Sequence, residues 1–409
     1  MKLRTFVAVL LFSFFCVSSA AADDTYNSAP TFSPYYAGSV KAEVLNKALE
    51  ELNYIRWLIG VPNNVTLNSD YTKKAQHGAV LLDAIDTLTH TPAKPSDMSQ
   101  SFYELGYDAT THGNIASWWR TKNGEKFGDI SLSKSIKMYM DDSDSNNISR
   151  VGHRVWLMDP KMKYTGFGIS TRRGYSVTYV YEEFGDFHDW YEENMTEMTE
   201  EQLKEYTQWF KWPISDEFIT WPASKHEHPL TYFNFETAWS VTLNSDVFDK
   251  PSSSSVNVHL ERLSDKKAWN FGSSSSDGYF NINESTIIFR PNNISSYSNG
   301  EEWRVNVSGL KRKDGGAGTF NYTVKFTSAL TGYELSEEED KTTIETQRNN
   351  EDDKENDNEN ETATGTQENK NSSSGGGGCN SFEISSLICV FLILGIPRVK
   401  KISFERVGK

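Results

Sequence analysis

Cysteine is almost absent from this chain. It has 409 residues and three cysteines, and none of the three lies between Asp23 and Gly378. The absence excludes disulfide bonds, a thiolate zinc site and a cysteine nucleophile from this stretch. The folded part must therefore be stabilised by its apolar core, and some 300 residues are enough for two ordinary domains.

Positive charge is also in short supply. The chain has 41 Lys and Arg residues against 56 Asp and Glu residues, which gives a net charge of −15. The excess of acid extends over the predicted folded part as well as the segment after it. Because a phosphate backbone is attracted by basic surfaces, we do not expect nucleic acid as a partner.

Three frequent catalytic motifs are missing as well. The chain contains no Gly-x-Ser-x-Gly, no His-Glu-x-x-His and no phosphate-binding glycine loop. The sequence therefore gives no sign of a serine hydrolase elbow, a zinc peptidase helix or a nucleotide site.

Residues 1–22 have the three parts of a secretory signal peptide. A basic start at Lys2 and Arg4 precedes an apolar run, and small residues come just before Asp23. This order predicts cleavage after Ala22 and export of the mature protein.

The C-terminal part of the chain is predicted to hold the protein at a surface. Residues 334–378 are rich in Glu, Asp, Asn, Ser and Gly, and so poor in apolar residues that they predict a disordered acidic stalk. Residues 379–409 contain Cys379, an apolar run of about 16 residues and a basic end, whereas a spanning helix usually needs about 20.

This order of glycines, a cysteine, an apolar run and basic residues resembles the C-terminal sorting tails of exported bacterial envelope proteins. The resemblance implies processing at Cys379 and contact with the membrane through the tail. We therefore expect the protein in the cell envelope or at the cell surface, with release from it as the alternative.

Hydrophobic periodicity predicts an α/β region in the N-terminal half. Apolar residues at three- and four-residue spacing predict helices over about 41–60, 68–90 and 133–142. Residues 175–181 alternate as a strand does. Helices followed by strands favour an α/β sandwich.

The pattern changes after an aromatic connector over residues 191–228. Residues 229–330 consist of short alternating segments separated by Ser, Gly and Asn turns, which predicts an all-β, immunoglobulin-like antiparallel sandwich. Trp209, Trp212 and Trp221 in the connector favour packing onto one domain, with sugar or peptide binding as the alternative.

Two segments of the α/β region each carry a histidine at the predicted end of a helix. They are Leu-Thr-His90-Thr-Pro and Val-Gly-His153-Arg-Val-Trp. Neutral imidazole binds metals and carries protons near pH 7, so a pair facing across a cleft is a candidate site. The alternative is that each histidine only caps carbonyl groups at a helix end.

An oxygen-rich segment follows the third predicted helix. Asp142-Ser-Asp-Ser-Asn146 matches the first five positions of a calcium-binding loop, but Asn147 replaces the required glycine and His153 the final glutamate. The pattern favours a solvated capping loop over a calcium site.

Taken together, the motifs resemble the CAP superfamily of cysteine-rich secretory, antigen-five and pathogenesis-related proteins, in its bacterial form. In chain order they are Leu52-Asn53-Tyr54-Ile55-Arg56, Gly60-Val61-Pro62, Ala75-Gln76, His90, Gly152-His153-Arg154 and Gly166-Phe167-Gly168. The resemblance covers about residues 41–190. It implies a three-layer α-β-α sandwich with a surface cleft, where two histidines and two acidic residues can hold a divalent metal, here zinc rather than calcium.

Carried over position by position, His90 matches the first family histidine and His153 the histidine of bacterial members. Animal members have their second histidine where this chain has Tyr175. One family acid lies three residues beyond an aromatic residue, here Tyr139, which makes it Asp142.

The second family acid belongs to a Gly-Glu-Asn-Ile motif, and this chain departs from it. The sequence reads His112-Gly113-Asn114-Ile115, so a glycine replaces the glutamate and a histidine precedes it. The expected cleft therefore holds His90, His112, Asp142 and His153, supported by Asn114, Tyr139 and Tyr175.

Two hypotheses for the function remain. The first is a surface-displayed binding protein whose cleft holds a metal or small ligand and whose β-sandwich contacts a partner. The second is an exported peptidase-like hydrolase that uses the cleft histidines. The missing glutamate and the missing nucleophile motifs favour binding over catalysis, because acid–base hydrolysis needs a carboxylate beside the reacting group.

Overall fold

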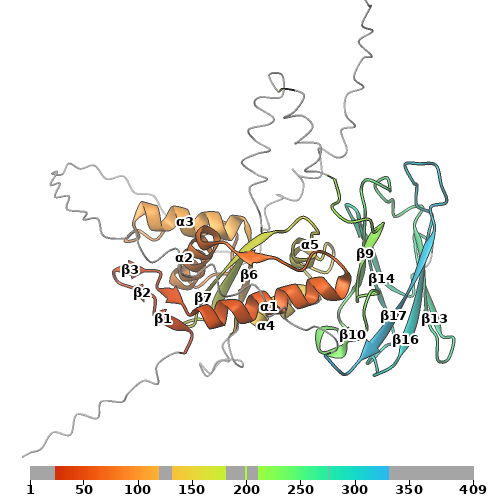
Figure 1. Ribbon diagram of the computed structural model, residues 1–409, viewed down its shortest axis with the longest axis horizontal. Coiled ribbons are helices and arrows are strands. Elements are labelled where there is room, and N and C mark those ends of the chain that lie inside the picture. Colours follow the sequence, from red (N-terminus) through yellow and green to blue (C-terminus); the bar gives the residue numbers. More distant parts are fainter. Residues whose placement is uncertain (1–23, 119–130, 181–198, 200–210, 275, 331–409) are drawn as a thin grey trace, which may run out of the picture.

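The computed structural model describes residues 24–118, 131–180, 199, 211–274 and 276–330. These residues form two domains that lie side by side (Figure 1). The predicted signal peptide, stalk and sorting tail with Cys379 lie outside the described residues, as does half of the predicted connector. In the described part of the chain, no helix has the length and apolar character needed to cross a membrane.

The first domain is built on a four-stranded sheet with the order β5-β7-β8-β6. The strands β7, β8 and β6 are antiparallel, while β5 runs parallel to β7. Their bounds are β5 (Thr66–Leu67), β6 (Gly113–Ser117), β7 (Tyr164–Ser170) and β8 (Tyr175–Tyr179). A small N-terminal extension adds two short antiparallel pairs, β1 (Tyr26–Ser28) with β4 (Ser39–Val40) and β2 (Thr31–Phe32) with β3 (Tyr35–Tyr36).

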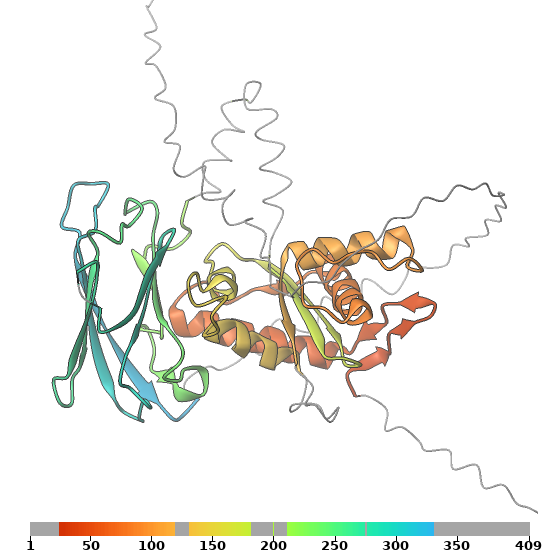
Figure 2. The same ribbon diagram turned by 180° about the vertical axis from the view of Figure 1, so that it is seen from behind.

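Helices cover both faces of this sheet, as Figures 1 and 2 show from opposite sides. One face packs against α2 and α3, and the other packs against α1 and α4. The helices are α1 (Ala42–Ile59), α2 (Ser69–Ile85), α3 (Gln100–Thr111), α4 (Leu132–Asp141) and α5 (Gly152–Leu157). The domain is therefore the three-layer α-β-α sandwich that the family resemblance implies.

Local capping explains where two predicted helices begin and end. Gly60 ends α1 in the left-handed conformation, with φ of 78°, which glycine adopts without strain. The Asn68 side chain accepts hydrogen bonds from the backbone N–H groups of Asp70 and Tyr71, which begins α2. Asp86 ends α2 at Ile85, so the helix is shorter than the predicted range up to residue 90.

Helix α3 has no counterpart in the sequence prediction. Its buried residues are Phe102, Gly106, Ala109 and Thr110, of which only Phe102 has a large apolar side chain, so the spacing of large apolar residues does not reveal the helix. The small residues have a packing role, because a Cβ at Gly106 would lie 3.0 Å from the His77 carbonyl oxygen of α2. Close approach of the two helices and the packing of Phe102 with Val80 and Leu81 of α2 keep α3 in place.

The second domain consists of two sheets packed face to face. The five-stranded sheet has the order β10-β17-β16-β12-β13 and the four-stranded sheet the order β14-β15-β11-β9. The strand bounds are β9 (Phe218–Trp221), β10 (His228–Pro229), β11 (Trp239–Leu243), β12 (Asn257–Arg262), β13 (Ala268–Phe271), β14 (Gly278–Asn283), β15 (Thr286–Pro291), β16 (Glu302–Ser308) and β17 (Phe320–Thr327); a short 3-10 helix, η1 (Leu230–Tyr232), follows β10.

Aromatic side chains from both sheets fill the space between them. Trp239 lies 6.0 Å from Trp303 between ring centroids, and its Nε1 donates a hydrogen bond to the hydroxyl of Tyr297. This core confirms the predicted β-sandwich. One pairing differs from the antiparallel expectation, since β10 runs parallel to β17.

The sandwich begins earlier in the chain than the predicted boundary at residue 229. Strand β9 pairs with β11, with Trp221 opposite Ser240, and is therefore an edge strand of the four-stranded sheet. Trp221 is fully buried in the core of the protein. The aromatic residues before residue 229 predicted a connector, but the last part of this segment forms strand β9 of the sandwich.

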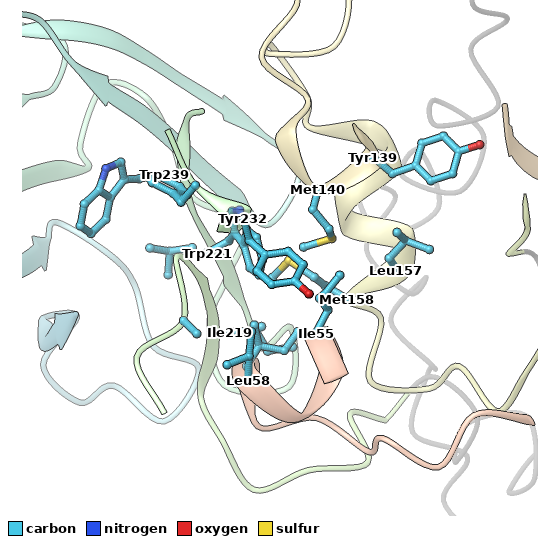
Figure 3. Close-up of a cluster of buried hydrophobic side chains, with 14 of the residues drawn as sticks. Ile55, Leu58, Tyr139, Met140, Leu157, Met158, Ile219, Trp221, Tyr232 and Trp239 are labelled. Atoms are coloured by element: carbon cyan, nitrogen blue, oxygen red, sulfur yellow. The ribbon is translucent and has the colours of Figure 1, made fainter. Parts of the chain in front are cut away.

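The two domains share an apolar joint, formed by α1 and α5 on one side and by β9, η1 and β11 on the other. Figure 3 shows Ile55, Leu58 and Met158 beside Ile219 and Tyr232, and all five belong to one continuous cluster of buried side chains. Aromatic contacts extend the joint at its edge, where the rings of Trp57 and His226 stack with centroids 3.7 Å apart.

The joint predicts that the two domains unfold together. Separating the domains would expose Leu58, which is fully buried, and Ile219, which is almost fully buried. Exposing these apolar side chains to water is unfavourable. We expect one calorimetric transition, and we expect Leu58→Ala to lower the free energy of unfolding by about 2–5 kcal/mol. Two separate transitions, with Leu58→Ala shifting only one, would contradict a shared core.

Candidate functional site

His90 lies in the loop after α2 and is tied to the end of α3. Its Nδ1 lies 2.7 Å from the Thr110 carbonyl oxygen, and the Thr110 hydroxyl donates back to the His90 carbonyl at 3.2 Å. Because a carbonyl oxygen only accepts, Nδ1 must carry the hydrogen. In the neutral ring, Nε2 is therefore left with a lone pair.

The pKa of His90 lies below its ordinary value, mainly because burial disfavours the charged imidazolium. The hydrogen bond to Thr110 opposes this shift, while the positive charges of His153 and Arg150 add to it. His90 is thus a neutral ring at pH 7.

His153 lies in α5 and is held by the carboxylate of Asp142. Its Nδ1 lies 2.7 Å from Oδ1 of Asp142, and the side chain of Asp142 is only 1% exposed. Asp142 ends α4 in the left-handed conformation, with φ of 44°, and its Oδ2 accepts a hydrogen bond from the backbone N–H of Arg154. Since an ionised carboxylate accepts, Nδ1 of His153 also carries the hydrogen and Nε2 is again the free nitrogen.

Asn114 and Tyr139, two of the expected supporting residues, form a chain of hydrogen bonds to the backbone of His153. The side-chain amide of Asn114 donates to the His153 carbonyl oxygen at 2.9 Å, and the hydroxyl of Tyr139 donates to the Asn114 carbonyl oxygen at 2.9 Å. The Tyr139 ring lies 5.1 Å from the His153 ring between centroids. Burial raises the pKa of Tyr139, which keeps this hydroxyl protonated as a donor.

His112 pairs with Asp108 rather than with the histidines of the expected cleft. It lies at the end of α3, where Nδ1 contacts Oδ1 of Asp108 at 2.6 Å, and Lys74 lies 2.7 Å from the other carboxylate oxygen. Burial raises the pKa of Asp108, but the hydrogen bonds and charges of His112 and Lys74 outweigh burial and lower it overall. His112 belongs to a local ion-pair group that holds α3 to α2.

Tyr175 also lies away from the paired histidines. In the sheet it is opposite Ser117, at the other end of β6 from Asn114, and its hydroxyl donates to Asp86 at 3.2 Å. It therefore secures the end of α2. The match to the animal histidine position does not bring this side chain to His90 or His153.

The missing glutamate has a steric explanation. A Cβ at Gly113 would lie 2.5 Å from the Ala109 carbonyl oxygen and 2.9 Å from a methyl group of Val177. These distances are shorter than real Cβ contacts, so α3 and β8 leave room only for glycine. An acidic side chain at this position would force α3 away from the sheet.

The donor set does not form a metal centre with three or more protein ligands. Within the residues that the structure describes, no group of three His, Cys, Asp or Glu side chains is arranged for a metal ion. Among the described residues, zinc would have at most the two Nε2 atoms of His90 and His153, whereas zinc sites in proteins usually offer three or four protein ligands.

The carboxylates of the loop after α4 make the contacts expected of a capping loop. Asp144 accepts hydrogen bonds from the Asn146 backbone and the Asn147 side chain, while both oxygens of Asp142 are engaged with His153 and Arg154. These oxygens stabilise the turn between α4 and α5.

A cavity of about 170 Å³ lies at the joint, away from the histidines. Its lining includes Val155 of α5 and Met158 directly after that helix, together with Trp212 and Ile219, but neither His90 nor His153. No local pattern in the chain indicates this cavity, because its walls come from segments far apart in the chain.

Arg154 is the residue near the site whose importance the sequence prediction missed. It appeared only as the third residue of the Gly-His-Arg motif, yet it is fully buried. A charged residue inside a motif that borders apolar positions was the available signal, since buried arginines require specific acceptors.

The comparison with protein families agrees with this geometry. Residues 49–184 match the model of the Cysteine-rich secretory protein family, CAP. This part of the chain is a CAP domain, and it is followed by a β-sandwich that the match does not cover. Searches among curated proteins and among solved structures gave no significant match.

Proposed function

We propose that this protein is an exported, surface-attached binding protein and that Nε2 of His90 and Nε2 of His153 contact its ligand. The observation that carries the proposal is that both Nδ1 atoms are committed to acceptors inside the protein. In its neutral form each ring then presents a lone pair at Nε2, and Nε2 makes no hydrogen bond within the described residues.

Two such nitrogens suit two kinds of ligand. They accept hydrogen bonds from a small molecule with N–H or O–H groups, or they coordinate a divalent metal ion such as zinc, with the remaining positions open to a bound molecule or water. The hydrogen bond from His153 to Asp142 is the kind of support that makes an imidazole a better ligand.

The β-sandwich is proposed to face a partner at the cell surface. Its five-stranded sheet alternates buried residues with exposed polar ones, and the exposed set on β16 includes Glu302 and Arg304. Export and attachment rest on the signal-peptide pattern and on the tail with Cys379.

Zinc titration by calorimetry tests the histidine assignment. We expect weak binding of one Zn²⁺ per chain, because two protein ligands hold the ion less well than three, and we expect His90→Gln or His153→Gln to weaken it roughly 10-fold or more. Since burial lowers the pKa of His90, its Nε2 should remain available somewhat below pH 6.5.

His77→Gln is the matched control for this titration. Nδ1 of His77 also contacts a backbone carbonyl, that of Lys73 at 2.7 Å, but this histidine lies on α2 outside the pair. The His77→Gln variant should bind zinc with the same affinity as the parent. No zinc binding by the parent, or equal binding by all variants, would contradict the assignment.

A second candidate function is hydrolysis, which the Asp142–His153 pair favours. A buried carboxylate that orients a histidine is the arrangement of a general base. A peptidase assay on the parent and on Asp142→Asn distinguishes the two: catalysis requires turnover in the parent that the variant loses, whereas a binding protein shows none in either.

A further inference from the structure

The segment that carries the site residues is docked on the β-sandwich. Residues 142–151 connect α4 to α5, and Ile148 and Val151 of this segment pack against Ala238 and Ile288 of the sandwich in a cluster of their own. The side-chain amide of Asn281, on β14, also donates a hydrogen bond to the Ser149 carbonyl oxygen. The loop between Asp142 and His153 thus has the second domain as its support.

The guanidinium of Arg154 joins the two domains. Its Nε and Nη2 donate to the carbonyl oxygens of Met140 and Asp141 at the end of α4, at 2.8 and 2.7 Å. Its Nη1 donates to the Ala238 carbonyl at 2.8 Å and to the Ser240 hydroxyl at 3.1 Å, both in the sandwich. One buried cation therefore connects α4, α5 and the start of β11.

The charge of this guanidinium is balanced without a direct carboxylate partner. Burial lowers the pKa of Arg154 to about 10, and the charges of Asp142 and Asp141 oppose that shift. The carbonyl groups at the end of α4 carry the negative end of the helix dipole, which favours a cation there. Arg154 remains charged at pH 7, so each of its acceptors is needed.

The same residue is also bonded to the carboxylate that orients the site histidine. The backbone N–H of Arg154 donates to Oδ2 of Asp142 at 3.0 Å, while Oδ1 accepts from Nδ1 of His153 at 2.7 Å. Two successive residues of α5 thus hold the two oxygens of one carboxylate. A shift of Arg154 toward or away from the sandwich moves this pair of hydrogen bonds.

We infer that the β-sandwich is a working part of the histidine site and that Arg154 is the positioning residue that couples them. This inference rests on the proposed function only in taking His90 and His153 as the site. If the sandwich acceptors are lost, a buried guanidinium is left with unsatisfied donors and must move toward solvent. Asp142 is then released, and Nδ1 of His153 loses the acceptor that fixes its hydrogen.

The tautomer of His153 reports this coupling directly. ¹⁵N NMR of the ring nitrogens of the full chain at neutral pH tells whether Nδ1 or Nε2 carries the hydrogen. The parent should show only the Nδ1–H form. Arg154→Lys keeps the charge but not the forked geometry, so it should add a population of the Nε2–H form and weaken zinc binding about 10-fold.

Arg56→Lys is the matched control, because Arg56 is equally buried and donates to several acceptors within the CAP domain. Its guanidinium donates to the carbonyl oxygens of Pro62, Leu157, Asp159 and Met162. This variant should lose stability as Arg154→Lys does, yet keep His153 in the Nδ1–H form. An equal tautomer change in both variants would mean that any loss of stability alters the His153 tautomer. That result would overturn the inference.

Ser240→Ala approaches the coupling from the sandwich side. It removes one acceptor of Arg154 without altering the CAP domain, and it should produce a smaller population of the Nε2–H form. If Arg154→Lys does not fold, Ser240→Ala becomes the decisive variant. An unchanged His153 tautomer in Ser240→Ala would then overturn the inference. The tautomer is measured without ligand. A parent that binds no zinc would therefore contradict the proposed function, but it would not affect the test of the coupling through Arg154.

Discussion

Gly168→Ala is expected to abolish the native packing of α2 on the central sheet. A Cβ at Gly168 would lie 2.2 Å from the backbone carbon and oxygen of Ala75, and real Cβ contacts stay above 3.0 Å. The clashing atoms belong to the helix backbone, so no side chain can turn aside. We expect a loss of roughly 3 kcal/mol or more in the free energy of unfolding, measured by urea denaturation.

Gly152→Ala is the control for this experiment. A Cβ at Gly152 would meet nothing closer than the side chain of Arg150 at 3.4 Å, which is ordinary contact, so its urea midpoint should stay near that of the parent. Equal midpoints for Gly168→Ala and the parent would show that α2 does not lie directly on β7.

Acid is expected to destabilise the protein through one buried histidine of the sandwich. His228 is fully buried; its Nδ1 accepts a hydrogen bond from the Ala223 N–H, and its ring lies edge-on to Trp221, with centroids 4.4 Å apart. Burial, with a smaller contribution from the charge of Arg154, lowers its pKa to about 3. The folded protein therefore keeps this ring neutral where an unfolded chain would protonate it.

The sign of the pH effect follows from this difference. In the unfolded chain the histidine takes up a proton near pH 6.5, so below that pH the unfolded state binds more protons than the folded one. The stabilisation is complete above pH 6.5 and is lost as the pH falls toward about 3. The slope is about 1.4 kcal/mol per pH unit, or about 3 kcal/mol between pH 6.5 and pH 4.5.

His228→Asn isolates this contribution in urea denaturation at a series of pH values. Asparagine keeps an acceptor for the Ala223 N–H but does not titrate, so the variant should be less stable at pH 7 and lose less stability in acid. His259→Asn replaces a partly exposed histidine of the same domain and should keep the parent's slope. A parent slope retained by His228→Asn would assign the acid sensitivity to other groups.

The sequence predicted features that depend on local chemistry. Gly60 and Asn68 specify helix ends through their own backbone and side-chain preferences, and they lie where the structure has them. His90 and His153 were identified because their flanking motifs are continuous in the chain. The place of Gly166-Phe167-Gly168 on β7 follows from the close approach of α2, which only glycine allows.

Features that depend on distant partners were out of reach. Tyr175 bonds to Asp86, a contact decided by sheet register and helix packing rather than by neighbouring residues. His112 contacts Asp108 only four residues away, a local pairing that was missed because α3 itself was not predicted. Strand β9 is short and lies in an aromatic segment, so nothing local separates it from a packed connector. The acceptors of Arg154 in the sandwich come from more than eighty residues further along the chain.

The apolar joint constrains how this protein can change during evolution. Ile55 and Leu58 on the CAP side face Ile219 and Tyr232 on the sandwich side, so substitutions at these positions should co-vary among relatives that keep both domains. A relative whose CAP domain stands alone should carry polar residues at positions 55 and 58. The family match ends at residue 184, yet selection for a folded protein acts on a unit that continues to the end of β17.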